Sequence, residues 1–212
     1  MKKILLIIPI ILVTEAFSDF QGHIYEIAPK LKEKMIEKHS WHRGCPVDTI
    51  NLRYLRMTYM DFDGEDQVGE LIVHKDVASD MISILKELYD IGYPIKQMKL
   101  VSDFGADDWQ SIEADNTSAF NCRNATGSKS WSRHSYGKAI DINPISNPYI
   151  SSKGHISHKA SQKYRKRIHR DSSAGDRALL LKNDEATQIF EKYGFKWGGD
   201  WKNNKDYQHF SK

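Results

Sequence analysis

The segment SRHSYGKAID, residues 132–141, places an imidazole and a carboxylate seven residues apart, with a glycine between them. Either this spacing arose by chance, since both residue types are common on protein surfaces, or the two side chains converge on a metal ion. A catalytic zinc ion takes three protein ligands and keeps a fourth position open. If His134 and Asp141 are two of these ligands, the third should come from elsewhere in the chain.

The C-terminal segment WGGDWKNNKDYQHF, residues 197–210, offers a third ligand in His209. Asp206 precedes this histidine by three residues. Zinc lowers the pKa of a bound water toward neutrality, and a nearby carboxylate can accept the proton and later pass it to a leaving amine. The two segments together therefore form a candidate constellation for metal-assisted hydrolysis.

The pattern S-x-H-x-x-G-x-A-x-D, followed far downstream by an acid-x-x-His, resembles the zinc D-alanyl-D-alanine carboxypeptidase family. That family includes the vancomycin-resistance D,D-peptidases and the L-alanyl-D-glutamate peptidases of phage endolysins. The segments DNTSAFNCR, AIDINPISNPY and WGGDWKNNKDYQHF also resemble its endolysin-like branch, and the resemblance covers most of the chain after about residue 41. The matching positions are Ser132, His134, Gly137, Ala139, Asp141, Asp206 and His209.

The resemblance implies that His134, Asp141 and His209 bind a zinc ion and that Asp206 is the general acid/base. Many relatives have glutamate at the position of Asp206. Because aspartate is shorter, either the backbone at Asp206 must lie closer to the metal-bound water, or the carboxylate must act through a second water.

Arg123, in the segment NCR, matches an arginine that relatives place near the metal. Its guanidinium could bind a substrate carbonyl oxygen or a substrate carboxylate, and the alternative is a salt bridge inside the fold. Ser132 and Trp201 are further predicted substrate contacts. Trp197 and Trp201 flank a Gly-Gly turn, where aromatic residues are also often simply part of the core.

The first 18 residues have the pattern of a secretory signal peptide, with Lys2 and Lys3 before the apolar run from Ile4 to Val13 and small residues before the expected cleavage after Ser18. A retained N-terminal anchor is the alternative. Removal of the signal lowers the formal net charge from +3 to +2, which argues against a nucleic-acid partner. We expect residues 19–212 to form one exported domain, periplasmic or extracellular, without stable membrane insertion.

The chain has two cysteines, Cys45 and Cys122, and export favours a disulfide between them over two buried thiols. His39, His42 and Cys45 form an H-x-x-H-x-x-C pattern that could also be a metal site. No fourth ligand follows at the spacing found in zinc fingers. We therefore interpret these residues as surface histidines and a disulfide-bonded cysteine.

The predicted secondary structure indicates an α+β fold, in which helices flank a small antiparallel sheet, and the resemblance implies a fold like that of hedgehog and D,D-peptidase domains. Periodicity and turn signals predict a helix after Pro29 to residue 38, a helix capped by Asp76 that ends at Gly92, and a helix capped by Asn183 that runs through Tyr193. They also predict strands over 52–62, 68–74, 95–104 and 138–143.

Two other charged groups allow alternative functions. The stretch 153–170 has many lysines and arginines and no acid, so it could contact anionic polymers or membrane surfaces, although a solvated face is the simpler interpretation. Asp103, Asp107 and Asp108 could bind calcium, but their spacing fits no standard loop.

The sequence therefore predicts an exported zinc peptidase that acts on peptidoglycan stem peptides. It leaves open whether the enzyme is a D-Ala-D-Ala carboxypeptidase or an L-Ala-D-Glu-type endopeptidase, and what its oligomeric state is. The alternative is a non-catalytic, zinc-stabilised cell-wall-binding module of the same fold, and an intact acid at Asp206 argues against it.

Overall fold

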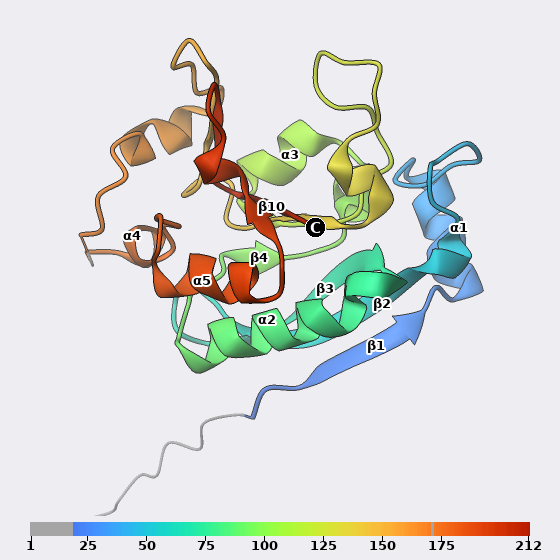
Figure 1. The fold of residues 1–212 in the computed structure, drawn as a ribbon. Coiled ribbons are helices and arrows are strands. Elements are labelled where there is room, and N and C mark those ends of the chain that lie inside the picture. Colours follow the sequence, from blue (N-terminus) through green and yellow to red (C-terminus); the bar gives the residue numbers. More distant parts are fainter. Residues whose placement is uncertain (1–18, 171) are drawn as a thin grey trace, which may run out of the picture.

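The computed structural model describes residues 19–170 and 172–212, and the predicted signal peptide, residues 1–18, lies outside them (Figure 1). Together the described residues form a single α+β domain, as the sequence predicted. Among these residues, no helix has the length and apolar character needed to cross a membrane.

A long hairpin forms the base of the domain. Strands β2 (Leu52–Met60) and β3 (Asp66–His74) pair antiparallel, as predicted, and β1 (Gly22–Glu26) adds a third strand in the order β1-β2-β3. Strand β1 is not predicted from the sequence. Helix α1 (Pro29–Glu37) begins at Pro29, as expected for a residue that favours the first helical position.

The two faces of the hairpin pack against different layers, because successive side chains in a strand point to opposite sides. Leu55 and the residue opposite it, Leu71, belong to the main core, which includes α2 and α5. Tyr54 and Ile72, the next pair in the register, belong to a second cluster with Met35 of α1 and the two cysteines.

Helix α2 (Ala78–Asp90) crosses the sheet, and α5 (Glu185–Lys192) packs beside it (Figure 1). Asp76 does not cap α2, contrary to prediction, because a 3-10 turn intervenes and its carboxylate accepts from Lys138 Nζ at 2.8 Å. The N-cap of α5 is Asp184 rather than Asn183, since the Asp184 carboxylate accepts the N–H of Thr187 at 2.7 Å.

The predicted strand over 95–104 is wrong for most of its length. Only β4 (Gln97–Met98) is extended, and it pairs parallel with β5 (Asn116–Thr117). The Asn116 side chain then binds the backbone N–H and C=O of Lys99, and a 3-10 turn, Val101–Phe104, follows. The side chain of Asn116, which is distant in sequence, thus binds the backbone groups of Lys99 that a longer strand would pair with a neighbouring strand.

The upper half of the molecule in Figure 1 consists of short elements around the C-terminal strand. Strands β6 (Ala139–Asp141), β10 (His209–Ser211) and β8 (Lys196–Trp197) form one small sheet, in the order β6-β10-β8. Strands β7 (Tyr149–Ile150) and β9 (Lys205–Asp206) form a separate ribbon. The remaining α-helices are α3 (Asp108–Glu113) and α4 (Ala174–Arg177), and the other 3-10 turns are Thr49–Asn51, Lys75–Val77, Arg133–Tyr136, Lys159–Tyr164 and Gly198–Asp200.

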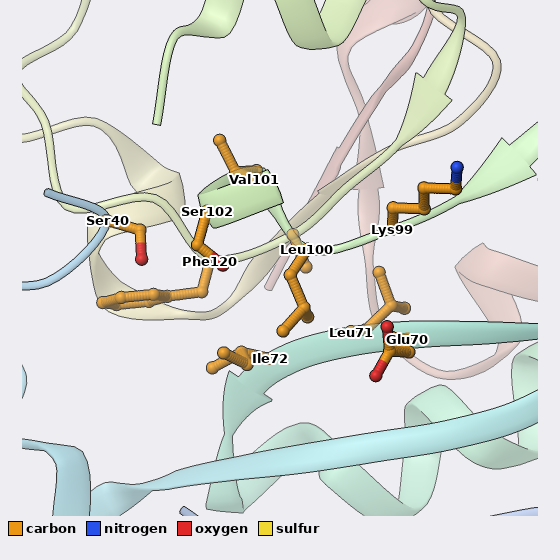
Figure 2. Close-up of a pocket in the computed structure, with 10 residues that line it drawn as sticks. Ser40, Glu70, Leu71, Ile72, Lys99, Leu100, Val101, Ser102 and Phe120 are labelled. Atoms are coloured by element: carbon orange, nitrogen blue, oxygen red, sulfur yellow. The ribbon is translucent and has the colours of Figure 1, made fainter. Parts of the chain in front are cut away.

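A small cavity lies between β3 and the chain around Leu100 and Phe120 (Figure 2). Its volume of about 10 Å³ is close to that of a single water site and far too small for a peptide. The cavity therefore belongs to the packing behind the chain at residues 119–120 and not to a substrate site.

Asp115 connects the end of α3 to the loop after β6. Its carboxylate accepts the N–H of Ile145 at 2.8 Å, and its backbone φ is 53°. Burial raises the pKa of Asp115 to about 6, although the bond from Ile145 opposes this shift. A carboxyl whose pKa is raised in the fold destabilises the native state once the pH exceeds its unfolded pKa.

We therefore expect Asp115→Asn to stabilise the protein at pH 8 by about 1–3 kcal/mol and to have little effect near pH 3.5. Asparagine keeps the acceptor for Ile145 and tolerates positive φ. Urea unfolding at the two pH values measures the difference. A variant that is less stable than the parent at pH 8 would contradict this account of Asp115.

Candidate functional site

The pairing of β10 with β6 brings His209 directly opposite Asp141. Ile142 N–H donates to Gln208 C=O at 3.0 Å, so the neighbouring pair His209–Asp141 is a non-hydrogen-bonded pair, whose side chains lie close together on one face. His209 Nδ1 is 3.0 Å from Asp141 Oδ1, and both residues are buried.

His134 reaches the same point from the 3-10 turn Arg133–Tyr136. Its Nε2 lies 3.2 Å from His209 Nδ1 and 3.2 Å from Asp141 Oδ2. Ser132 caps this turn, since its hydroxyl accepts the N–H of His134 at 3.3 Å. Gly137 ends it with φ +66°, and a Cβ there would lie 2.6 Å from the backbone nitrogen of His74. The serine and the glycine of the motif thus position His134.

The chain at residues 118–119 supports two members of this cluster at once. Ala119 C=O lies 2.6 Å from His134 Nδ1, and a carbonyl can only accept, so Nδ1 carries a proton and Nε2 is the nitrogen that faces Asp141 and His209. Ser118 exchanges both backbone hydrogen bonds with Asp141, at 2.8 and 3.0 Å. Hydrogen bonds of this kind orient metal ligands in proteins.

The three side chains fit a zinc ion. Zinc–ligand bonds of about 2.0–2.1 Å in a tetrahedron require ligand atoms about 3.3 Å apart. The two imidazole nitrogens are 3.2 Å apart, and Asp141 places Oδ1 3.0 Å from His209 and Oδ2 3.2 Å from His134. The three residues are one of two groups of possible metal ligands found in the described part of the chain. Two imidazoles and one carboxylate are also a donor set that zinc accepts.

Electrostatics within the cluster oppose the effect of burial. Burial alone would raise the pKa of Asp141, but the two adjacent histidines hold it well below its usual range. Burial would likewise lower the pKa of His134, but the Asp141 carboxylate outweighs burial and raises it. The cluster therefore favours a charged carboxylate between two imidazoles.

Asp206 lies next to the three ligands, on β9. Burial, together with the charge of Asp141, raises the pKa of Asp206 to about 7. Its Oδ1 is buried and has no hydrogen-bond partner among the described residues. A Cβ at Gly198 would lie 2.5 Å from the Asp206 carbonyl oxygen and 3.2 Å from His209 Cβ, so the first glycine of the Gly-Gly turn permits this close approach.

Two exposed aromatic side chains adjoin the cluster. The ring of Trp201 is 5.5 Å from that of His209 and is 38% exposed, whereas Trp197 is buried in the core. Tyr149 is 44% exposed and lies opposite Asp206 in the β7–β9 ribbon. Tyr207 N–H donates to Pro148 C=O, so Tyr149 and Asp206 form a non-hydrogen-bonded pair with neighbouring side chains. The role of Tyr149 is not predicted from the sequence.

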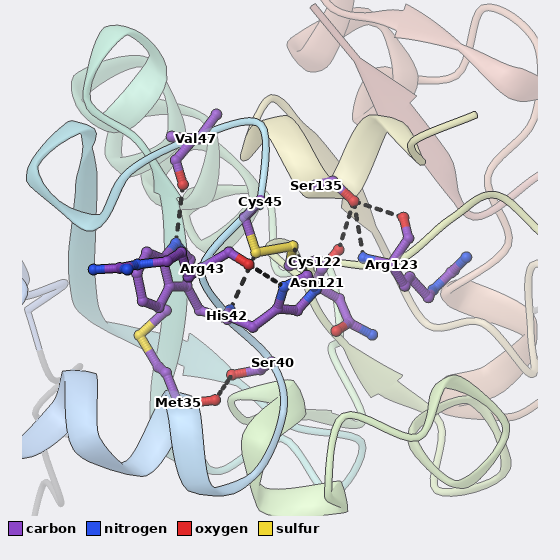
Figure 3. Close-up of a disulfide and its surroundings, with 11 residues drawn as sticks. Met35, Ser40, His42, Arg43, Cys45, Val47, Asn121, Cys122, Arg123 and Ser135 are labelled. Carbon is purple, nitrogen blue, oxygen red and sulfur yellow. Dashed lines mark hydrogen bonds between the residues drawn. A yellow bond between two sulfur atoms is a disulfide. The ribbon is translucent and has the colours of Figure 1, made fainter. Parts of the chain in front are cut away.

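The backbone of Arg123 is fixed by Ser135, the residue after His134 (Figure 3). The buried Ser135 hydroxyl is 3.0 Å from Arg123 N and 2.7 Å from Arg123 O, and it also contacts Asn121 O at 3.1 Å. Arg123 C=O accepts a further bond from Ser132 N–H at 3.0 Å. The segment that bears Arg123 and the turn that bears His134 therefore form one unit.

The guanidinium of Arg123 forms a salt bridge with Asp108, whose carboxylate accepts a hydrogen bond from Nη2 at 2.7 Å. This contact is the internal salt bridge that the sequence allowed as the alternative to substrate binding by Arg123. The three acids considered for calcium have separate partners: Asp103 pairs with Lys34, and Asp107 caps α3. The pairing of Asp108 with Arg123 was not predicted from the sequence, because the two residues are 15 positions apart.

A disulfide joins Cys45 and Cys122, as predicted (Figure 3). The second group of possible metal ligands, His42, Cys45 and Cys122, contains both cysteines of this bridge. Disulfide sulfurs are not thiolates, the form of cysteine that binds metal, so this group is a poor zinc site while the bridge is intact. His39, the first histidine of the pattern, is not part of the group.

Arg167 of the basic stretch 153–170 has a structural role. Arg167 is half-buried, donates to Ser146 C=O and Asn147 Oδ1 at 2.6 Å each, and lies over the ring of Tyr207 at 4.4 Å. It thereby ties the basic stretch to the residue after Asp206. Most other lysines and arginines of the stretch are exposed, as a solvated face would be.

Residues 126–212 match the model of a family described as D-alanyl-D-alanine carboxypeptidase. This match supports the predicted family, and it covers His134, Asp141, His209 and Asp206 but not Arg123 or the cysteines. Comparisons of the chain with curated proteins and with solved structures found no match.

We expect the purified protein to contain about one zinc ion per chain, and His209→Ala to lose it, because two remaining ligands bind zinc weakly. Elemental analysis after dialysis measures the content. His42→Ala is the matched control and should keep the metal, since His42 belongs only to the second group. Full zinc occupancy in a His134→Ala/His209→Ala double variant would refute this site.

We also expect reduction of the disulfide to lower the free energy of unfolding by about 4 kcal/mol, because the bridge spans 77 residues. Denaturant unfolding with and without a phosphine reductant measures this loss. A Cys45→Ser/Cys122→Ser variant controls for side effects of the reductant and should not respond to it. Equal stability of the oxidised and reduced protein would contradict the prediction.

Proposed function

We propose that this chain, whose residues 126–212 match the D-alanyl-D-alanine carboxypeptidase family, is an exported zinc peptidase that hydrolyses the stem peptides of peptidoglycan. The observation that carries this proposal is a buried cluster of three zinc-type ligands with the Asp206 carboxylate beside it, one oxygen of which is buried and has no hydrogen-bond partner among the described residues. A purely structural zinc site needs four protein ligands and no additional acid.

In the proposed enzyme, His134, Asp141 and His209 hold the zinc ion. The hydrogen bond from Nδ1 to Ala119 C=O orients the ring of His134, so that Nε2 faces the metal position. A zinc ion at this position supplies Lewis-acid polarisation of a peptide carbonyl and a water of lowered pKa.

Asp206 is the proposed general acid/base. Its carboxylate accepts a proton from the attacking water and passes it to the amine that leaves. The raised pKa of Asp206 agrees with this role, because a general base works best when its pKa is near the working pH. Gly198 compensates for the short aspartate, since it lets the backbone of β9 approach the ligands closely.

Arg123 and Trp201 are the proposed substrate contacts. Arg123 Nε has no partner among the described residues, but it is buried, so a substrate carbonyl reaches it only after the side chains around it move. Trp201 offers an exposed ring beside His209. Ser132 is a weaker candidate for direct contact, since its hydroxyl already caps the turn of His134.

The rival function is a non-catalytic, zinc-stabilised wall-binding module. A binding module has no need for a half-buried carboxylate such as Asp206, one oxygen of which is removed from water without a hydrogen-bond partner among the described residues. A hydrolase uses such a carboxylate as its general acid/base, and we therefore favour the peptidase over the binding module.

We predict that Asp206→Asn keeps zinc and loses activity by about 10²–10⁴-fold, the usual effect of removing a general acid/base. Mass spectrometry of muropeptides digested by the zinc-loaded protein measures turnover and identifies the product. Asp200→Asn is a matched control, because Asp200 is exposed and its carboxylate pairs with Lys182.

Activity near the parental level in Asp206→Asn would exclude the proposed role. Loss of zinc in that variant would instead identify Asp206 as a fourth ligand. If the parent protein binds muropeptides without cleaving them, the binding module is the correct function.

A further inference from the structure

We infer that His42, Cys45 and Cys122 form a second zinc site once the disulfide between the two cysteines is reduced. This inference does not depend on the proposed peptidase function, because none of the three residues belongs to the first ligand cluster. Each side chain offers one ligand atom, and these atoms lie within 4.8 Å of one another (Figure 3). Two thiolates and one imidazole, with a fourth position left open, are a donor set that zinc uses in enzymes.

The imidazole of His42 is already placed as a ligand would be. Its Nε2 lies 3.6 Å from Cys122 Sγ. Zinc bonds of ordinary length in a tetrahedron put a ligand nitrogen and a ligand sulfur about 3.6 Å apart. The other ring nitrogen, Nδ1, lies 3.0 Å from Arg43 C=O, which can only accept, so Nδ1 carries a proton. A carbonyl on the far ring nitrogen is the usual support of a metal-bound histidine.

A tight turn brings His42 and Cys45 to the same position. The Cys45 N–H donates to His42 C=O at 3.2 Å, and Gly44 supplies the positive φ of 104° within the turn. Two ligands separated by two residues have the spacing of ligand pairs in structural zinc sites. The His42 N–H also donates to Cys45 Sγ at 3.2 Å, a bond that stabilises the charged thiolate.

The segments that carry the ligands are held together by contacts other than the disulfide. The Cys122 N–H donates to Ser40 C=O at 3.0 Å. The ring N–H of Trp41 donates to Val47 C=O at 2.9 Å and closes the loop around Cys45. Both cysteines also pack in one apolar cluster with Trp41 and Val47. These contacts keep the ligands adjacent after the bond between the two sulfurs is broken.

Reduction changes the sulfur atoms from a disulfide, which binds no metal, into two ligands. A thiol or phosphine reductant gives two electrons to the sulfur pair, which takes up two protons and becomes two thiols. Zinc then binds both sulfurs as thiolates, and the two protons are released. The exposed His42 and the partly exposed Cys45 give the reductant and the metal access to the buried Cys122.

The geometry of the cysteine pair allows this change without movement of the backbone. Two sulfurs on one zinc ion lie about 3.8 Å apart, farther than in a disulfide. The Cα atoms of Cys45 and Cys122 are 5.9 Å apart, so rotation of the two side chains supplies the separation. The disulfide and the zinc ion are therefore alternative cross-links between the same two segments.

The test measures the zinc content of the folded, full-length mature protein before and after reduction with a phosphine in a zinc-buffered solution. The readout is the change on reduction, so it does not depend on whether the first cluster holds zinc. We expect the parent to gain about one zinc ion per chain. Cobalt in place of zinc should show a thiolate-to-cobalt charge-transfer absorption in the reduced protein alone.

Two histidine variants isolate the contribution of the imidazole. His42→Ala should lower the zinc affinity of the reduced protein by at least about 10–100-fold, because even the outer partners of metal ligands contribute that much. His39→Asn is the matched control and should gain zinc as the parent does. His39 lies outside the group, and asparagine tolerates its φ of 61°.

Unfolding by denaturant separates binding by the fold from binding by loose thiols. Zinc should raise the unfolding midpoint of the reduced parent, since a ligand that prefers the folded state stabilises it. The midpoint of reduced His42→Ala should respond far less, and that of the Cys45→Ser/Cys122→Ser variant should show no effect of reduction.

Three results would overturn the inference. The first is no gain of zinc on reduction of the parent. The second is an equal gain in His42→Ala, which would mean that the two thiols bind zinc without the histidine. The third is a gain of zinc without a rise in the unfolding midpoint, which would assign the binding to the unfolded chain.

Discussion

His209 lies opposite Asp141 because β10 pairs antiparallel with β6, and the remaining groups of the site are arranged around this pair. A shift of one residue in the register would turn His209 to the other face of the sheet and dissolve the cluster. Phe210, the next residue, is fully buried and stacks on Phe190 of α5 at 3.9 Å. The main core thus fixes the register on which the candidate metal site depends.

The cost of burying these polar groups explains the supporting structure around them. Two imidazoles and a carboxylate removed from water require partners, and the chain at residues 118–119 supplies them to both His134 and Asp141. The disulfide and the Ser135 hydroxyl hold the adjoining segment, which bears Arg123. Rigid support of this kind keeps ligands in place before a metal binds.

The sequence predicted that His134, Asp141 and His209 lie together, and it predicted the long hairpin, because both have strong local patterns. The disulfide was predictable from the cysteine count and expected export. Contacts between distant residues were not predictable: Asp108 pairs with Arg123, Asn116 interrupts the strand predicted over 95–104, and β1 is extended because β2 offers it a partner. The position of Tyr149 near the site was not predictable either, since only the β7–β9 register places it beside Asp206.

Anomalous diffraction from crystals of the mature protein, measured on both sides of the zinc absorption edge, tests the central claim most directly. The account predicts one strong zinc peak within about 2.0–2.2 Å of His134 Nε2, His209 Nδ1 and the Asp141 carboxylate. Asp206 should lie near this peak without binding it. Absence of a peak there in active protein, or a peak at His42 instead, would contradict the account.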